Sequence, residues 1–150
     1  MSVSIRIIGV NQAIRNITRY ASSVNTGIRG EIFKGSEDIS SDAKRFAPVD
    51  LGNLREGIGY TVKDRSKGTL VEGEVISSDP SSAYLEYGTG PHYPPIAAIT
   101  PWAERKGIDP YALQKSIGEN GTKEHPYMLP AYLKNEKKII NGCRKVLRSI

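Results

Sequence analysis

The feature that most constrains the fold is the spacing of apolar residues at the end of the chain. From Leu129 to Ile150, apolar side chains recur at alternating intervals of three and four, which places them on one face of a helix. Only Glu136 interrupts this stripe. The sequence therefore predicts an amphipathic C-terminal helix of about five to six turns.

The same spacing recurs in the first third of the chain. Apolar residues from Val10 to Val24 predict a first helix over Asn11 to Ser23. The segment Asn25-Thr26-Gly27 is expected to break it. A second stripe, from Ile28 to Ala47, predicts a longer helix. Because a proline disfavours helical geometry in the residue before it, Pro48 is expected to end that helix.

Strands are indicated by a different pattern. Ser2 to Ile8 alternates apolar with polar residues, which is typical of a half-buried strand. Two further β-rich runs, Ile58 to Asp64 and Leu70 to Ser77, are joined by the five residues Arg65 to Thr69. This length and composition predict a β-hairpin.

The remaining segments are predicted to be turns and short helices. Val49 to Gly52 is expected to form a turn, with Asp50 capping a short helical turn through residues 53–55. The proline-rich stretch from His92 to Pro101 is expected to be a loop before a short helix that Gly107 ends. Another short helix is expected over Tyr111 to Ile117, followed by a loop over Gly118 to Pro126.

These elements predict an α+β fold in a single domain spanning residues 1–150. A small antiparallel sheet, made of the N-terminal strand and the hairpin, is expected to be packed by two long helices. One is the long helix that follows the first helix, and the other is the C-terminal helix. A chain of 150 residues is long enough to bury a hydrophobic core without disulfides, and Cys143 is its one cysteine.

The charge balance leaves one alternative open. The net charge is +5, and much of the excess lies in the C-terminal helix. Its basic residues, which are opposed only by Glu136, are Lys134, Lys137, Lys138, Arg144, Lys145 and Arg148. A basic face of this kind is usually only solvated, but it is also what a nucleic-acid-binding module would present.

Candidate catalytic and ligand-binding groups do not form a recognisable motif. Gly88-Thr89-Gly90 lacks the further residues of a dinucleotide or phosphate loop and is interpreted as a structural turn. His92 and His125, taken with Glu86 or Asp109, match no compact metal motif. No Gly-x-Ser-x-Gly elbow occurs, and Cys143 lies on the apolar stripe. We expect no cofactor, no metal and no enzymatic activity; a small hydrolase or nuclease using Glu86, His92 and His125 is the weakest alternative.

Three motifs in order carry a family resemblance. They are residues 47–55 (APVDLGNLR), residues 83–89 (AYLEYGT) and residues 121–131 (GTKEHPYMLPA). Together they resemble the family of tailed-phage tail-component proteins typified by the tenth gene product of the lambdoid phage HK-ninety-seven. The sequence departs from the family pattern at Leu51, Gly57 and Tyr127, where Thr or Ser, Ser, and Phe respectively are common.

The resemblance implies a structural virion protein of the neck or tail-completion region, made in the cytoplasm of the bacterial host, and not an enzyme. It implies assembly of the chain with itself into a cyclic ring, expected to be hexameric. Its neighbours would be head-closure, tail-terminator or tail-tube proteins. Non-specific contact with genomic DNA is compatible with this role. No apolar run is long enough for a signal peptide or a membrane span, so no membrane partner is expected.

Candidate assembly residues lie in or near the motifs and the proline-rich stretch. Exposed aromatic residues and arginines are common interface anchors, although they can equally be ordinary packing. For Glu86, two roles are open: a hydrogen bond to the amides of the following Gly-Thr turn, or a contact with an arginine of a neighbouring subunit. The candidates are Pro48, Asp50, Arg55, Tyr84, Glu86, Tyr87, Tyr93, Trp102, His125 and Tyr127.

Overall fold

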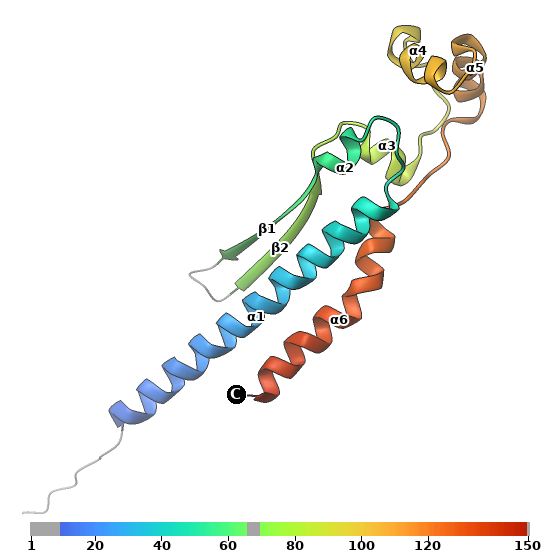
Figure 1. The fold of residues 1–150 in the computed structure, drawn as a ribbon. Coiled ribbons are helices and arrows are strands. Elements are labelled where there is room, and N and C mark those ends of the chain that lie inside the picture. The colour runs from blue at the N-terminus through green and yellow to red at the C-terminus, as the bar shows by residue number, and fades with distance from the viewer. Residues whose placement is uncertain (1–9, 66–69, 150) are drawn as a thin grey trace, which may run out of the picture. The chain divides into compact units, whose positions relative to one another are not determined.

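The computed structural model describes residues 10–65 and 70–149 and confirms the predicted α+β class (Figure 1). Its elements, in chain order, are α1 (Val10–Phe46), α2 (Asn53–Gly57), β1 (Ile58–Arg65), β2 (Leu70–Ser77), α3 (Ser82–Tyr87), α4 (Ile96–Arg105), α5 (Pro110–Asn120) and α6 (Met128–Ser149). The predicted hairpin is present as a two-stranded antiparallel sheet. The predicted N-terminal strand lies outside the described residues.

The chain divides into two compact units. Unit 1 comprises residues 1–40, 60–75 and 133–150, and unit 2 comprises residues 41–59 and 76–132. Unit 1 therefore contains most of α1, most of the hairpin and most of α6. Unit 2 contains the end of α1, the start of α6 and all the short helices between them.

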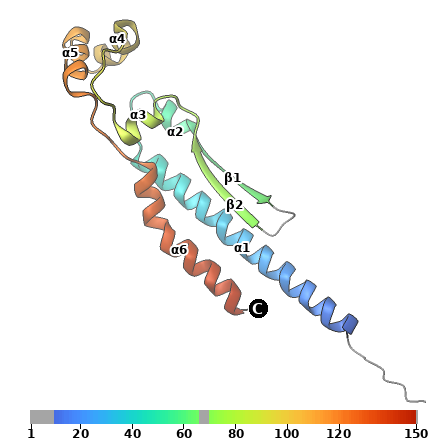
Figure 2. The same ribbon diagram turned by 180° about the vertical axis from the view of Figure 1, so that it is seen from behind.

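In unit 1, α1 contacts both the hairpin and α6 (Figures 1 and 2). A Cβ added at Gly73 of β2 would lie 2.4 Å from Ser36 Oγ, so the hairpin backbone comes very close to α1. On the α6 side, a Cβ at Gly35 would lie 2.4 Å from Ile139 Cγ1. Glycines on α1 and β2 therefore allow these elements to pack closely.

The two helices predicted for the first third are in fact one helix, α1. The expected break at Asn25-Thr26-Gly27 is wrong, because all three residues are helical. A Cβ at Gly27 would lie 2.5 Å from Val146 Cγ1 of α6. Gly27 thus makes room for a neighbouring helix, and this packing outweighs the modest cost of glycine in a helix.

The predicted C-terminal helix is confirmed as α6, which begins one residue earlier than expected. Pro130 is its third residue, where a missing backbone N–H costs nothing because no intrahelical partner exists there. Ile150 lies outside the described residues. Ion pairs between Lys138 and Asp38, and between Arg29 and Asp64, join α1 to α6 and to β1 within unit 1.

The middle of the chain differs from expectation at two helices. The loop predicted over residues 92–101 ends sooner, because α4 begins at Ile96 and contains Pro101. Pro101 cannot bond the carbonyl of Ala97, but only that one bond is lost, and α4 packs against α5. Gly107, with φ of 68°, ends α4 as predicted. The other helix, α5, continues through the expected loop residue Gly118 to Asn120.

Candidate assembly surface

All ten candidate residues belong to unit 2, but their side chains do different things. Three of them bond or pack within the chain at helix ends: Arg55, Glu86 and Tyr127. Five line an open groove: Pro48, Asp50, Tyr84, Trp102 and His125. Tyr87 and Tyr93 are largely exposed and lie outside this groove.

Glu86 is buried and caps the start of α6. Its carboxylate accepts hydrogen bonds from the backbone amides of Tyr127, Met128 and Leu129, at 2.9, 3.0 and 2.8 Å. These amides have no partner inside the helix, and a negative charge at a helix N-terminus is favourable. The structure therefore shows the intrachain role, but the predicted donors, those of the Gly-Thr turn, are wrong.

Arg55 has the corresponding role at the C-terminal end of α1. Its Nε and one terminal guanidinium nitrogen donate to the carbonyl oxygen of Ala47, at 3.4 and 3.3 Å. A positive side chain at a helix C-terminus both satisfies a free carbonyl and complements the helix dipole. The first two family motifs thus each supply a charged side chain that fixes a helix end.

Tyr127 is fully buried, with 0% of its surface exposed. Its hydroxyl has no hydrogen-bond partner among the residues that the structure describes. Burying a hydroxyl without a partner costs free energy. A phenylalanine at this position would avoid that cost.

The Gly88 to Gly90 segment is held by a β-bridge. Thr89 and Thr122 form an isolated antiparallel bridge, with both N–H to carbonyl distances at 3.1 Å. Their hydroxyl oxygens are 3.0 Å apart. The bridge joins the segments that lead to α4 and back from α5, so residues 90–121 form a helical pair closed at its base (Figure 1).

The groove in unit 2 has a volume of about 840 Å³. Its walls come from the turn after α1, from α3, α4 and α5, and from residues 121–125. Apolar side chains, among them Leu54, Leu85 and Ile117, make up much of its lining. A groove of this kind is suited to apolar side chains of a protein partner more than to a charged small molecule.

Asp50 lies on this groove and does not cap α2 as predicted. The residue at the N-cap of α2 is Gly52, and no side-chain hydrogen bond caps that helix. Instead Asp50 pairs with Arg105 and, at 3.6 Å, with Lys106 at the end of α4. The hydrogen bond from Arg105, together with both positive charges, holds the pKa of Asp50 below its ordinary value.

The exposed aromatic candidates remain available for contacts. Tyr84, Tyr87 and Tyr93 are 62%, 79% and 68% exposed. The ring of Tyr93 lies over α5, since a Cβ at Gly118 would come within 2.3 Å of it. Periodicity alone missed this contact, although a glycine inside a helical pattern is a usual sign of close approach.

The two histidines weighed for catalysis have different surroundings. His92 Nδ1 is 3.0 Å from the carbonyl oxygen of Gly90, while His125 lines the groove. Within residues 10–65 and 70–149, no cluster of three or more histidine, cysteine, aspartate or glutamate residues could hold a metal ion. In unit 1, burial, reinforced by the Glu31 carboxylate, raises the pKa of the Cys143 thiol, which disfavours the reactive thiolate.

The comparison with protein families decides the assignment. Residues 11–88 match the HK97-gp10-like family, which is described as "Bacteriophage HK97-gp10, putative tail-component". The chain belongs to this family. The match spans α1 to α3 and includes Arg55 and Glu86, whereas the third motif lies beyond it. Searches among curated proteins and among solved structures found no match.

Membership of this family supports a structural role in a bacteriophage tail. Across the described part of the chain, no helix combines the length and apolar character needed to cross a membrane.

Proposed function

We propose that this HK97-gp10-like protein is a neck or tail-completion component that assembles with itself as a ring at the junction of head and tail. The observation that carries the proposal is the amount of apolar surface on the single chain. Among the described residues, 9 apolar residues are buried whereas 20 large hydrophobic ones are exposed. A subunit of a permanent assembly needs exposed apolar surface, because obligate interfaces are the more hydrophobic ones.

Deleting the gene from a phage that carries it tests the role in the particle. We expect filled heads and separate tails in electron micrographs, with infectivity restored by a plasmid copy of the gene. Normal infectious particles without the gene would rule the role out.

The exposed tyrosines allow a sharper version of the same experiment. Replacing Tyr87 with alanine removes a side chain that is 79% exposed, so the melting temperature should not change. Complementation by Y87A should nevertheless fall at least tenfold if Tyr87 contacts a neighbour. K115A, which alters an exposed residue of α5, is the matched control and should complement fully.

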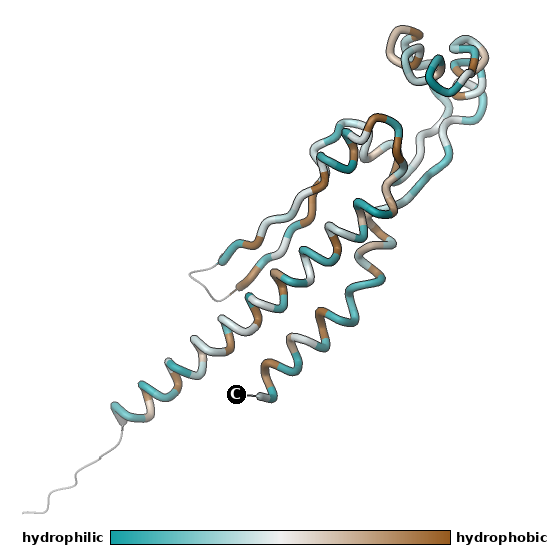
Figure 3. Tube along the Cα trace, viewed as in Figure 1, coloured by the Kyte–Doolittle hydropathy of each residue, from teal (hydrophilic) through white to brown (hydrophobic). Residues whose placement is uncertain are grey.

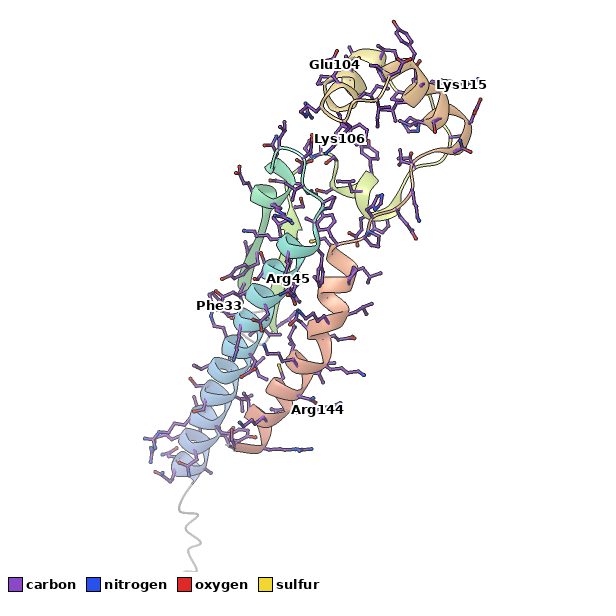
Figure 4. The ribbon with its side chains drawn as sticks, turned by 45° about the vertical axis from the view of Figure 1, so that its right-hand side comes forward. Phe33, Arg45, Glu104, Lys106, Lys115 and Arg144 are labelled. Carbon is purple, nitrogen blue, oxygen red and sulfur yellow. The ribbon has the colours of Figure 1, made fainter. Side chains whose placement is uncertain are left out.

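A second proposal concerns contact with the genome. Among the described residues, unit 1 holds 12 basic and 7 acidic residues, whereas unit 2 holds 7 basic and 9 acidic ones. Any non-specific DNA contact therefore belongs to unit 1, where Arg144 (Figure 4), Lys145 and Arg148 of α6 are exposed. DNA retardation that falls steeply with salt, and is lost in the triple alanine variant of these residues, would support it.

A further inference from the structure

Helix α6 has a second apolar face, which is exposed. Its side toward α1 carries Ile139 and Val146, the residues that the glycines of α1 make room for. Leu133, Ile140 and Leu147 lie on another side of the helix and are 56%, 42% and 52% exposed. They recur every seven residues, which is about two helical turns, so they form one stripe. In Figure 3 hydrophobic residues recur along α6 between hydrophilic ones.

The hairpin has an exposed face on the other side of α1. Gly73 of β2 lies against Ser36 of α1, and side chains alternate between the two faces of a strand. Leu70, Glu72 and Glu74 therefore point away from α1, and all three are exposed. Figures 1 and 2 both show α1 between the hairpin and α6. Unit 1 thus has three layers, and the outer faces of the hairpin and of α6 are both exposed.

A leucine on each outer face lies at the same height along α1. On α6, Leu147 follows the residue that meets Gly27. On the hairpin, Leu70 lies about 10 Å before Gly73 along β2, a distance that corresponds to about seven residues of α1. Because Gly73 lies against Ser36, Leu70 is also near the height of Gly27. From there α6 runs antiparallel to α1 toward its own N-terminus, and β2 runs parallel to α1 (Figure 1).

The charges beyond these leucines are complementary. In the direction of α1, α6 presents Arg144 and Lys137 about 5 and 15 Å beyond its leucine, whereas β2 presents Glu72 and Glu74 about 7 and 13 Å beyond its own. The two basic residues are exposed and form no ion pair in the described part of the chain. The glutamates pair with cations of β1 at 2.5 and 4.0 Å, but a carboxylate has two oxygens and can accept from a second cation. Two α6 faces packed together would instead bring like charges close.

We propose that the outer face of α6 in one copy packs on the outer face of the hairpin in the next copy. Each copy then uses two different faces, and contacts of this kind close into a ring when a rotation relates the copies. A rotation about an axis along α1 keeps all copies at one height, so it preserves the match of leucines and charges and leaves the axis open. The inference rests on the proposed ring, and it names the contact between its subunits.

Two aspartate substitutions test the contact in the full-length protein. L147D places a charge on the α6 face and L70D places one on the hairpin face, whereas N141D places the same charge on another side of α6. Light scattering after gel filtration should show an oligomer larger than a dimer for the wild type and N141D, but monomers for L147D and for L70D. Mixing these two variants in equal amounts should give a dimer, because one intact pair of faces remains. A monomeric or dimeric wild type, variants of unchanged size, or a mixture that stays monomeric would overturn the inference.

Cysteine cross-linking keeps the test valid if an aspartate variant fails to fold. In a C143A background, a short bismaleimide should link L70C/L147C chains into species longer than dimers, and should link L70C/N141C chains far less. Equal linking of both, or dimers formed by L147C alone, would overturn the inference. The outcomes separate the two proposals: L147D chains that still form rings remove this contact but leave the ring, whereas infectious particles without the gene remove the neck role and leave the contact.

Discussion

Glu86 and Arg55 show how single residues fix the path of this chain. Each places a charged side chain against backbone groups that a helix end leaves without partners, Arg55 at the end of α1 and Glu86 at the start of α6. Three amides converge on one carboxylate at Glu86. Hydrogen bonds to a charged group contribute more free energy than those between neutral groups. These two residues therefore fix where α1 ends and where α6 begins.

Replacing Glu86 with glutamine should therefore destabilise the fold. The amide keeps one acceptor oxygen but turns N–H donors toward backbone N–H groups, and it lacks the charge that complements the helix dipole. We expect E86Q to lower the free energy of unfolding by about 2 kcal/mol, measured by urea denaturation. E124Q, at an exposed residue nearby, is the control and should leave it unchanged; an equal effect of both would contradict the capping role.

Tyr127 offers a prediction of the opposite sign. Because its buried hydroxyl lacks a partner in the described part of the chain, Y127F should be neutral or should raise the free energy of unfolding by up to about 1 kcal/mol. Y127A should lower it by about 3 to 5 kcal/mol, because it leaves a cavity. Thermal unfolding checks both, and a clearly destabilised Y127F would show that the hydroxyl has a partner.

At the scale of elements, α1 tests how close packing competes with helix propensity. Gly30 has no atom within 4 Å of an added Cβ, whereas Gly35 would meet Ile139 at 2.4 Å. In the same helix, G30A should raise the free energy of unfolding by up to about 1 kcal/mol. G35A should lower it by about 1 to 2 kcal/mol, because overpacking outweighs the gain in propensity. Similar effects at both positions would contradict the close α1–α6 contact.

The same competition explains which elements could be predicted from sequence. Local spacing of apolar residues predicts α1, α6 and the hairpin, because each pattern depends only on residues close together in the sequence. Gly27 and Gly118 were interpreted as breakers, but they make room for Val146 and Tyr93, which requires knowing which segments meet. The capping role of Glu86 was missed for the same reason, since its donors follow about 40 residues later and no local pattern reports them.

At the scale of the whole molecule, the bridge between Thr89 and Thr122 closes the base of the α4–α5 pair. The pair also contacts the rest of unit 2 along the groove and through the ion pairs of Asp50 with Arg105 and Lys106. The family match ends at residue 88, just before this bridge. Glu86 precedes the bridge in the sequence, and its partners at the start of α6 follow it, so both lie outside the segment that the bridge closes. The hydrogen bonds that Glu86 accepts at the start of α6 therefore involve no residue of α4 or α5.

Removing residues 91–120 should consequently leave a folded protein. The deletion joins Gly90 to Gly121 and leaves Thr89-Gly-Gly-Thr122, which is a two-residue glycine loop between residues that already form an antiparallel bridge. Such loops suit tight hairpin turns. We expect cooperative unfolding to persist and amides of α1, the hairpin and α6 to keep their protection in hydrogen exchange. E86Q should cost the same in the shortened chain as in the full chain, since its three donors are retained. Loss of cooperative unfolding would instead mean that α4 and α5 are part of the folding core.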